Sequence, residues 1–442
     1  MIGLNKELER LEKEGKRIKV GLVGTGQMGT DIISQITLMK GIEVVAMADK
    51  TVDKVEEACK IANLDLSRLI KVNDPEKGDE FLREGKILIT DDYRIIPHLS
   101  GIDAVIEATG DPNAGTEVSI LSIKNGKHII TLSVEMDITV GVILHRVAER
   151  KGVVYTLAAG DEPPAIKELY DFASSLGLRI IAVGKGKNNP LDRFATPDSL
   201  SEVARKRGVN PVRLTEFVDG SKTMVEMAAV SNATGLVPDV QGMHGPHASV
   251  RDLLKIFSLK KDGGILNKEG IVDYVIGDLK PGVFLIFTTD HPRLKEALIL
   301  RDMGHGPNYL LVRPYHLCSM EVPLSVALAC IEKKPTMYSV NQVSEVVAVA
   351  KKDLYAGERL DFIGGKTFFA TIDVRENVKG ALPIGLAQNA FIKNSIKKGE
   401  IIKLSDVQVE ENLVFKVWEI QNSFLEGIMS EEEAIQKVVE LV

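Results

Sequence analysis

Three lysines stand beside small or amide residues instead of inside runs of charge. Lys185 and Lys187 belong to residues 184–190, and Lys222 belongs to residues 219–223. An ammonium group can donate a proton to a developing alkoxide and can hold an anionic substrate. Because burial lowers the pKa of a lysine toward neutrality, these side chains are candidates for proton donation and substrate binding. A solvated surface lysine is the alternative reading of each one.

Carboxylates in the same region offer a second kind of chemistry. They could supply a base or acid for proton transfer, or oxygen ligands for a divalent cation such as Mg²⁺ or Mn²⁺. The candidates are Asp161, Glu162, Asp219 and Glu226. Their spacing does not resemble a DxD pattern, so the sequence leaves the metal open.

Neutral and cationic side chains nearby could bind the substrate. Asn188 and Asn189 would hydrogen-bond substrate hydroxyls, although asparagines in such a cluster are also typical of turns. Ser221 is a further candidate for substrate binding. Arg313 and His316, in the string RPYH, could hold an anionic group, with a loop role as the alternative.

The first part of the chain has the pattern of a dinucleotide site. Residues 19–29, KVGLVGTGQMG, read as an apolar strand, a glycine-rich turn and the start of a helix. In this pattern the first glycine allows a tight turn, the second lets backbone N–H groups approach a pyrophosphate, and the third lets the helix lie close to the strand. A helix N-terminus also favours phosphate. The predicted contacts are Gly24, Thr25, Gly26, Gln27, Met28 and Gly29; a glycine-rich turn without a ligand is the alternative.

Two further turns extend this predicted site. Asp49 follows the second apolar strand and would accept hydrogen bonds from the adenosine ribose of NAD. Lys50 could instead pair with the 2′-phosphate of NADP, so the choice between the two cofactors stays open. The turn Ala108, Thr109 and Gly110 ends another apolar strand, where the nicotinamide half of the cofactor would pass.

Strands and helices alternate up to about residue 158, which predicts a parallel sheet covered on both faces. After that, polar clusters interrupt the alternation, and short strands with turns follow from residue 344. We therefore expect an α/β protein with a Rossmann-type parallel sheet, a second α/β (α+β) catalytic domain and a small β-rich domain. The expected segments are residues 1–158, 159–340 and 341–442.

Several strings along the chain resemble one group of enzymes. They are GLVGTGQMGTDI, AGDEPP, GKGKNNPL, DGSKTMVEMA, GLVPD, HGPH, VDY, RPYH and EVP. On these strings the chain is similar to homoserine-dehydrogenase-like oxidoreductases with a C-terminal SAF domain (a β-clip module), and most similar to the deoxyxylulose-phosphate-reductoisomerase-like (DRL) members. Ordinary homoserine dehydrogenases have Asn-Lys after the fifth strand. Here Val134 and Glu135 stand at that place, so homoserine is not the expected substrate.

The resemblance implies an activity. The substrate would be 1-deoxy-D-xylulose 5-phosphate, whose carbon skeleton is rearranged and then reduced with NADPH to methylerythritol phosphate, in isoprenoid precursor synthesis. Dehydrogenation of another small hydroxy acid or sugar derivative is one alternative. A regulator that senses a nucleotide without turnover is another. The SAF module could cover the substrate site, with residues 382–386 as a lid, or could serve packing alone.

Composition narrows the possible partners. The chain of 442 residues has a formal net charge of −7, which argues against general nucleic-acid binding. No apolar run approaches the roughly 20 residues that a membrane span needs. The N-terminus lacks the apolar segment of a signal peptide, and three cysteines without CxxC spacing indicate neither a disulfide framework nor a zinc site. We expect a cytoplasmic homo-oligomer that acts on a small molecule.

Overall fold

The structure, a computed structural model, describes residues 3–442 and consists of two compact units. Unit 1 comprises the described residues up to Asp161, together with Leu317–Tyr338 and Asn412–Val442. Unit 2 comprises Glu162–His316 and Ser339–Glu411. The chain therefore passes between the units several times, while the expected division into three consecutive segments stays a prediction.

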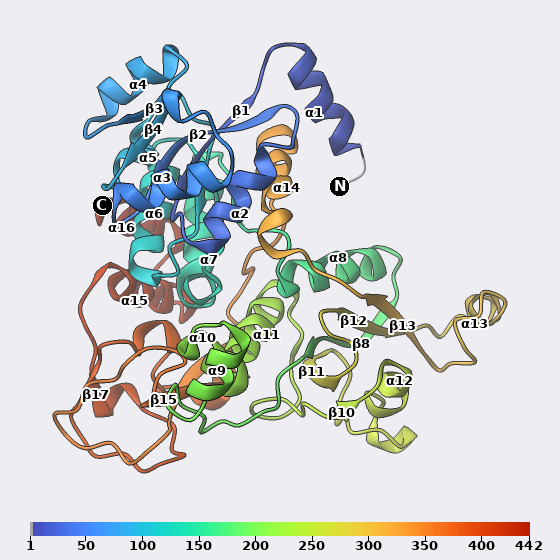
Figure 1. The fold of residues 1–442 in the computed structure, drawn as a ribbon. Coiled ribbons are helices and arrows are strands. Elements are labelled where there is room, and N and C mark those ends of the chain that lie inside the picture. The colour runs from blue at the N-terminus through green and yellow to red at the C-terminus, as the bar shows by residue number, and fades with distance from the viewer. Residues whose placement is uncertain (1–2) are drawn as a thin grey trace. The chain divides into compact units, whose positions relative to one another are not determined.

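Unit 1 is built on a seven-stranded parallel sheet with the strand order β3-β4-β2-β1-β5-β6-β7 (Figure 1). The strands are β1 (Ile18–Val23), β2 (Ile42–Ala48), β3 (Leu69–Lys71), β4 (Ile87–Thr90), β5 (Ala104–Glu107), β6 (His128–Thr131) and β7 (Tyr155–Leu157). Nearly all of their residues from β1, β2 and β4 to β7 are buried, as expected for parallel strands covered on both faces. The order reverses beside β1, so the turns after β1 and β5 lie next to each other at the carboxyl edge.

Helices of unit 1 bury the two faces of this sheet. They are α1 (Leu4–Lys13), α2 (Gln27–Ile36), α3 (Val52–Ile61), α4 (Pro75–Arg83), α5 (Ile95–His98), α6 (Pro112–Lys124), α7 (Val134–Lys151), α14 (Val322–Ala327), α15 (Leu413–Leu425) and α16 (Glu431–Glu440). Helix α15 is joined to α7 through buried Gln421, which accepts the Ile143 N–H and donates to the Thr139 carbonyl. The Ser430 side chain accepts the Glu433 N–H and so caps the N-terminus of α16.

Unit 2 contains a mixed sheet with the order β10-β11-β8-β12-β13, and β9 also pairs with β11. The strands are β8 (Arg179–Lys187), β9 (Val237–Pro238), β10 (His247–Ala248), β11 (Ile271–Gly277), β12 (Val283–Thr288) and β13 (Asn308–Arg313). Central β8 runs parallel to β11 and antiparallel to β12. Strand β8 is thus hydrogen-bonded along both of its edges. Lys185 and Lys187, near its carboxyl end, are therefore held on a well-fixed backbone.

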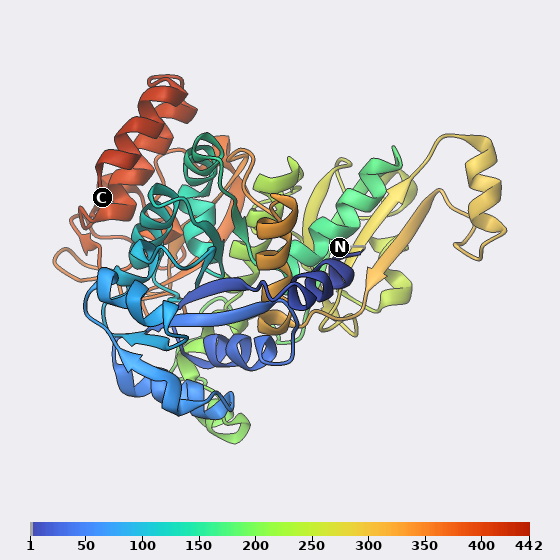
Figure 2. The same ribbon diagram turned by 90° about the horizontal axis from the view of Figure 1, so that it is seen from above.

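The helices of unit 2 differ sharply in burial. They are α8 (Glu162–Ser175), α9 (Ser201–Arg207), α10 (Pro211–Val218), α11 (Ser221–Thr234), α12 (Leu253–Ile256) and α13 (Pro292–Ile299). Helix α11 is buried almost throughout, whereas none of the residues of α13 is buried. Figure 2 shows α13 standing away from the sheet at the end of the β12–β13 connection.

The remainder of unit 2 forms short antiparallel pairs. Strand β14 (Ser344–Ala350) pairs with β15 (Phe368–Val374), and β16 (Phe391–Ile392) with β17 (Val407–Gln408). This β-rich region agrees with the expected short strands, while its assignment as an SAF domain stays a prediction. The expected lid does not form an exposed loop: Leu382, Ile384 and Leu386 are at most 4% exposed and lie in the core.

The expected fold class is confirmed: the chain is an α/β protein with a Rossmann-like parallel sheet, a second mixed α/β sheet and small antiparallel sheets. Among residues 3–442, no helix has the length and apolar character to cross a bilayer.

Candidate functional site

The glycine-rich turn after β1 shows three different packing environments. Gly24 has a φ of +99°, and a Cβ there would lie 2.4 Å from the Ala108 carbonyl oxygen. A Cβ on Gly29 would lie 2.1 Å from the Gly24 carbonyl oxygen. Gly26, at the start of α2, has no atom within 4 Å of its Cβ position. Two glycines are therefore needed by the fold, and the third leaves open space before a helix N-terminus, where a phosphate would be stabilised.

Asp49 holds this turn in place. Its Oδ2 accepts the Thr25 N–H at 2.8 Å and the Thr25 hydroxyl at 3.1 Å, and its Oδ1 accepts the Lys50 N–H. From the sequence, Asp49 was expected to bind the ribose, and this ordering role was not predicted. Lys50 and Gln27 are exposed, and Met28 is half-buried. Contacts of these residues with a cofactor stay predictions.

The second turn of the site depends on a carboxylate that the sequence analysis missed. Glu107, at the end of β5, is fully buried. It accepts the Thr109 N–H at 2.7 Å and the Thr109 and Thr131 hydroxyls at 2.6 Å each. These bonds fix the turn formed by Ala108, Thr109 and Gly110 beside the glycine loop. A lone Glu inside the apolar string DAVIEATG was the available signal.

In unit 2, Lys185 lies between two carboxylates from different helices. Its Nζ is 2.5 Å from a Glu162 carboxylate oxygen, and it also forms an ion pair with Glu226. Glu162 begins α8 and Glu226 belongs to α11, while Lys185 belongs to β8. Lys185 is 5% exposed and Glu226 is 1% exposed. The cluster is therefore shielded from water on most sides, which strengthens its electrostatic interactions.

This pairing reverses one expectation from the sequence. Burial alone would lower the pKa of the Lys185 ammonium, but Glu162 and Glu226 outweigh burial and hold that pKa above its usual value. An ammonium has three N–H donors, and the two carboxylates take two of them. No other partner of the Lys185 ammonium occurs among residues 3–442. One N–H of the ammonium thus remains without a protein partner among the described residues.

His316 belongs to the same cluster, and Arg313 has contacts elsewhere. The His316 Nε2 is 3.5 Å from the Glu162 Oε1 atom. Arg313 instead pairs with Glu168 at 3.1 Å and lies over the Tyr315 ring. Asp161 directly precedes Glu162 and is the last residue of the first segment of unit 1.

The Lys187 ammonium is bonded to backbone carbonyl groups of the protein. Its Nζ donates to the backbone carbonyls of Asn189 at 2.9 Å, Pro190 at 3.4 Å and Phe217 at 2.5 Å. Burial, with a smaller contribution from nearby Lys185, lowers the pKa of Lys187 to about 8. Desolvation therefore acts at Lys187 in the predicted direction, but all three N–H donors are occupied by the turn.

The amides beside Lys187 also bond within the protein. The Asn189 Nδ2 donates to the Asn188 Oδ1 at 3.1 Å, and its Oδ1 accepts from Arg207 at 3.0 Å. This arrangement favours the turn role that the sequence left open. Direct contact of Asn188 or Asn189 with a substrate stays a prediction.

The string around Asp219 joins α11 to the β-rich region of unit 2. Asp219 forms a buried ion pair with Lys351 at 2.8 Å, and the fully buried Ser221 hydroxyl accepts the Ala370 N–H at 2.9 Å. Ser221 therefore joins α11 to β15, and its expected contact with a substrate stays a prediction. Lys222 is half-buried, and it precedes Glu226 by four positions, so both lie on one face of α11.

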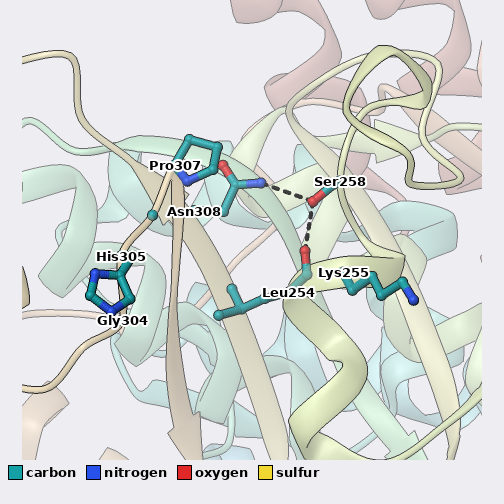
Figure 3. Close-up of a pocket in the computed structure, with 8 residues that line it drawn as sticks. Leu254, Lys255, Ser258, Gly304, His305, Pro307 and Asn308 are labelled. Atoms are coloured by element: carbon teal, nitrogen blue, oxygen red, sulfur yellow. Dashed lines mark hydrogen bonds between the residues drawn. The ribbon is translucent and has the colours of Figure 1, made fainter.

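A hollow of about 240 Å³ lies elsewhere in unit 2 (Figure 3). Leu254, Lys255 and Ser258 line one side of it, and residues 304–308 line the other. The Asn308 side chain donates to the Ser258 hydroxyl at 3.2 Å across the hollow. It contains none of the residues that the sequence predicted for catalysis.

Comparison with known proteins adds one match in sequence. Residues 160–322 match the family model described as the catalytic domain of oxidoreductase DRL. The match covers 163 of the 442 residues and includes Glu162, Lys185 and Glu226. No curated protein matches the sequence. The chain thus combines a match to an oxidoreductase catalytic domain with a Rossmann-like sheet whose first turn is glycine-rich.

Several solved structures are similar at low identity. A probable dehydrogenase from Thermotoga maritima is 12% identical, with 96% of this chain and 97% of that chain covered and a TM-score of 0.34. A DOX-P reductoisomerase in complex with magnesium is 15% identical, with 48% and 57% covered and a TM-score of 0.33. A mutant of KijD10, a 3-ketoreductase from Actinomadura kijaniata in complex with TDP-benzene and NADP, is 13% identical, with 72% and 90% covered and a TM-score of 0.33. Likenesses this distant carry no argument about substrate or cofactor.

Proposed function

We propose that the protein is an NAD(P)H-dependent oxidoreductase that reduces a carbonyl group of a small phosphorylated sugar. The observation that carries the proposal is the glycine turn, in which Gly24 and Gly29 are closely packed and Gly26 faces open space. The match of residues 160–322 to an oxidoreductase catalytic domain supports it. Following the resemblance of the sequence strings, 1-deoxy-D-xylulose 5-phosphate is the first substrate to test, with an unphosphorylated hydroxy acid as the alternative. We also propose that the protein forms a homo-oligomer.

Lys185 would polarise the substrate carbonyl. When bound, a nicotinamide cofactor would supply the hydride, and negative charge would develop on the carbonyl oxygen of the substrate. The third N–H of Lys185 would donate to that oxygen, and a donor fixed in a dry site stabilises developing charge strongly. Because Glu162 and Glu226 raise the pKa of Lys185, the ammonium stays charged over the physiological range.

Lys185 would give a proton to the product oxygen. Glu162 and His316 would then supply a new proton to Lys185. Glu162 contacts Lys185 on one side, and the His316 Nε2 is 3.5 Å from it on the other. A proton can therefore pass from the imidazole to the carboxylate and on to Lys185 along neighbouring polar atoms. Lys222, on the same face of α11 as Glu226, is the further cation proposed near the substrate.

The carboxylates fit a divalent cation poorly. Glu162 and Glu226 offer the hard oxygen ligands that Mg²⁺ prefers, but both are paired with the Lys185 ammonium. A cation between them would have to displace that charge. We therefore expect turnover without added Mg²⁺ or Mn²⁺.

The test is consumption of NADPH and of NADH with 1-deoxy-D-xylulose 5-phosphate, with and without Mg²⁺ or Mn²⁺. Turnover with either dinucleotide supports the proposal and identifies the cofactor. The proposed function would be overturned if the protein bound neither NADPH nor NADH. Binding without turnover of any phosphorylated sugar would leave the hydroxy acids as the substrate class.

Substituting the open glycine of the turn separates binding from folding. Gly26→Ala is expected to leave the melting temperature unchanged, because its φ of −63° and open surroundings accept a methyl group. The methyl group would occupy space next to the phosphates and weaken dinucleotide binding about tenfold or more. Fluorescence titration with NADPH and NADH measures the change. Gly29→Ala is the contrasting variant: its clash with the Gly24 carbonyl should lower the melting temperature itself. Equal dinucleotide affinity of Gly26→Ala and wild type would argue against a site at this turn.

A further inference from the structure

The loop of residues 239–246 is held tightly within unit 2. It connects β9 to β10, which both pair with β11. The buried carboxylate of Asp273, on β11, accepts the His244 N–H at 3.0 Å and the Gly245 N–H at 2.9 Å. The Gly242 N–H donates to the Ile372 carbonyl on β15 at 2.7 Å. The loop therefore has a fixed place between β11 and β15.

A cation without an anionic partner lies against this loop. Arg193 is half-buried, and it forms no hydrogen bond or ion pair with the part of the chain that the structure describes. Its guanidinium carbon lies 5.9 Å from the centre of the Phe369 ring. Half-buried arginines usually satisfy their donors, because an unpaired charge removed from water is costly. This one is positioned but unpaired.

Two hydroxyl groups lie near the Arg193 guanidinium. The buried Thr371 Oγ1 has no hydrogen-bond partner. A Cβ on Gly242 would lie 2.8 Å from an Arg193 guanidinium nitrogen and 3.1 Å from the Thr371 Oγ1, so both groups approach the same glycine. The Tyr274 hydroxyl lies under Gly245, whose Cβ position is 2.2 Å from it, and the charge of Arg193 also reaches Tyr274. Glycines at 242 and 245 keep side chains out of this place.

The Tyr274 side chain lies on the same face of the sheet as Lys185. Tyr274 of β11 is the register partner of Lys185 of β8, and side chains at paired positions of neighbouring strands point to the same face. The strands are about 4.8 Å apart. A molecule of a few carbon atoms whose oxygen meets Lys185 could thus place its other end beyond Tyr274, at Arg193.

We propose that Arg193, Thr371 and Tyr274 form an anion subsite for the terminal phosphate of the substrate. The proposal rests on the proposed function. The guanidinium fork matches two phosphate oxygens, and the two hydroxyls donate to the same dianion. The 2′-phosphate of NADP has the same chemistry, and the experiment below separates the two sources.

The test is calorimetric titration of the full-length protein with inorganic phosphate, in chloride buffer of constant ionic strength. Arg193→Gln is expected to weaken phosphate binding about 10- to 100-fold, because hydrogen bonds to charged groups are lost. Arg251→Gln, at an exposed arginine of the same unit, is the matched control and should stay within about twofold of wild type. Equal binding by Arg193→Gln and wild type, or equal losses in both variants, would overturn the proposal.

The variant Thr371→Val tests whether phosphate binding can be weakened without a loss of stability. Since the Thr371 hydroxyl has no partner, the methyl group should keep or raise the melting temperature while weakening phosphate binding several-fold. Titrations with NADPH and NADH complete the test. A loss of NADPH affinity in Arg193→Gln without a loss of NADH affinity would overturn the assignment to the substrate. Absence of dinucleotide binding in the wild type would contradict the proposed function alone, because the phosphate titration requires no cofactor.

Discussion

Lys185→Met is expected to lower kcat by roughly 10²- to 10⁴-fold while leaving NADPH and NADH affinity unchanged. Removing a fixed donor to a developing oxyanion, or a general acid, has effects of this size. The dinucleotide turn belongs to unit 1 and Lys185 to unit 2, so the two functions should separate. Stopped-flow reduction with 1-deoxy-D-xylulose 5-phosphate and fluorescence titration of each dinucleotide are the two measurements.

The control must account for the carboxylates that the lysine neutralises. Methionine at position 185 removes the Lys185 charge from the buried carboxylates of Glu162 and Glu226, which costs up to about 3–5 kcal/mol of stability. The double variant Lys185→Met/Glu226→Gln keeps the net charge of the three side chains unchanged and should regain much of the lost melting temperature. Its turnover should stay low. A Lys185→Met protein with more than a tenth of the wild-type kcat would show that Lys185 is not catalytic.

Features decided by neighbouring residues could be predicted from the sequence. Gly24 needs a positive φ, and Gly29 needs space beside the Gly24 carbonyl, and both requirements arise within one turn and the helix that follows it. The parallel sheet followed from the alternation of apolar strands and helices. The cap of α16 is equally local, because Ser430 and Glu433 are three positions apart.

Pairing between distant positions could not be predicted. Lys185 and Glu226 are 41 positions apart, and only the fold of unit 2 brings the side chains of β8 and α11 together. The sequence suggested that burial would lower the pKa of such a lysine, but the carboxylates reverse that direction. Ser221 illustrates the same limit, since its hydroxyl binds the N–H of Ala370, 149 positions away.

Arg193 shows why a complete residue inventory would still have missed a site. It stands next to the exposed Asp192 in the sequence, as a surface arginine often does. Its significance depends on Gly242 and Thr371, which approach it only in the folded unit. Spacing along the chain holds no signal for such a cluster.

The contribution of Glu345 to the stability of the protein is expected to fall as the pH rises from 6 to 8. This residue of β14 is 8% exposed and faces Asp373 across the β14–β15 pair. Burial raises its pKa from 4.5 to about 8, although Arg375 and the Gln342 amide favour its ionised form. Between these values the folded protein holds one more proton than the unfolded chain. Raising the pH therefore favours unfolding by about 1.4 kcal/mol per pH unit, and by up to about 5 kcal/mol across the window.

Glu345→Gln removes this titration while keeping the shape of the side chain. The free energy of unfolding of the variant should be less dependent on pH than that of wild type, and urea-unfolding midpoints at pH 6, 7 and 8 measure the difference. Other groups also titrate near this range: burial raises the pKa of Asp273 to about 6, lowers the pKa values of His128 and His145 to about 4, and lowers the pKa of Lys187 to about 8. These groups are the same in both proteins, so the difference between the two pH curves reports Glu345. Glu376→Gln, at a carboxylate paired with Lys379 on the surface, is the matched control and should keep the wild-type slope. Parallel curves for Glu345→Gln and wild type would mean that Glu345 is already ionised in the folded protein, with its charge held by Arg375.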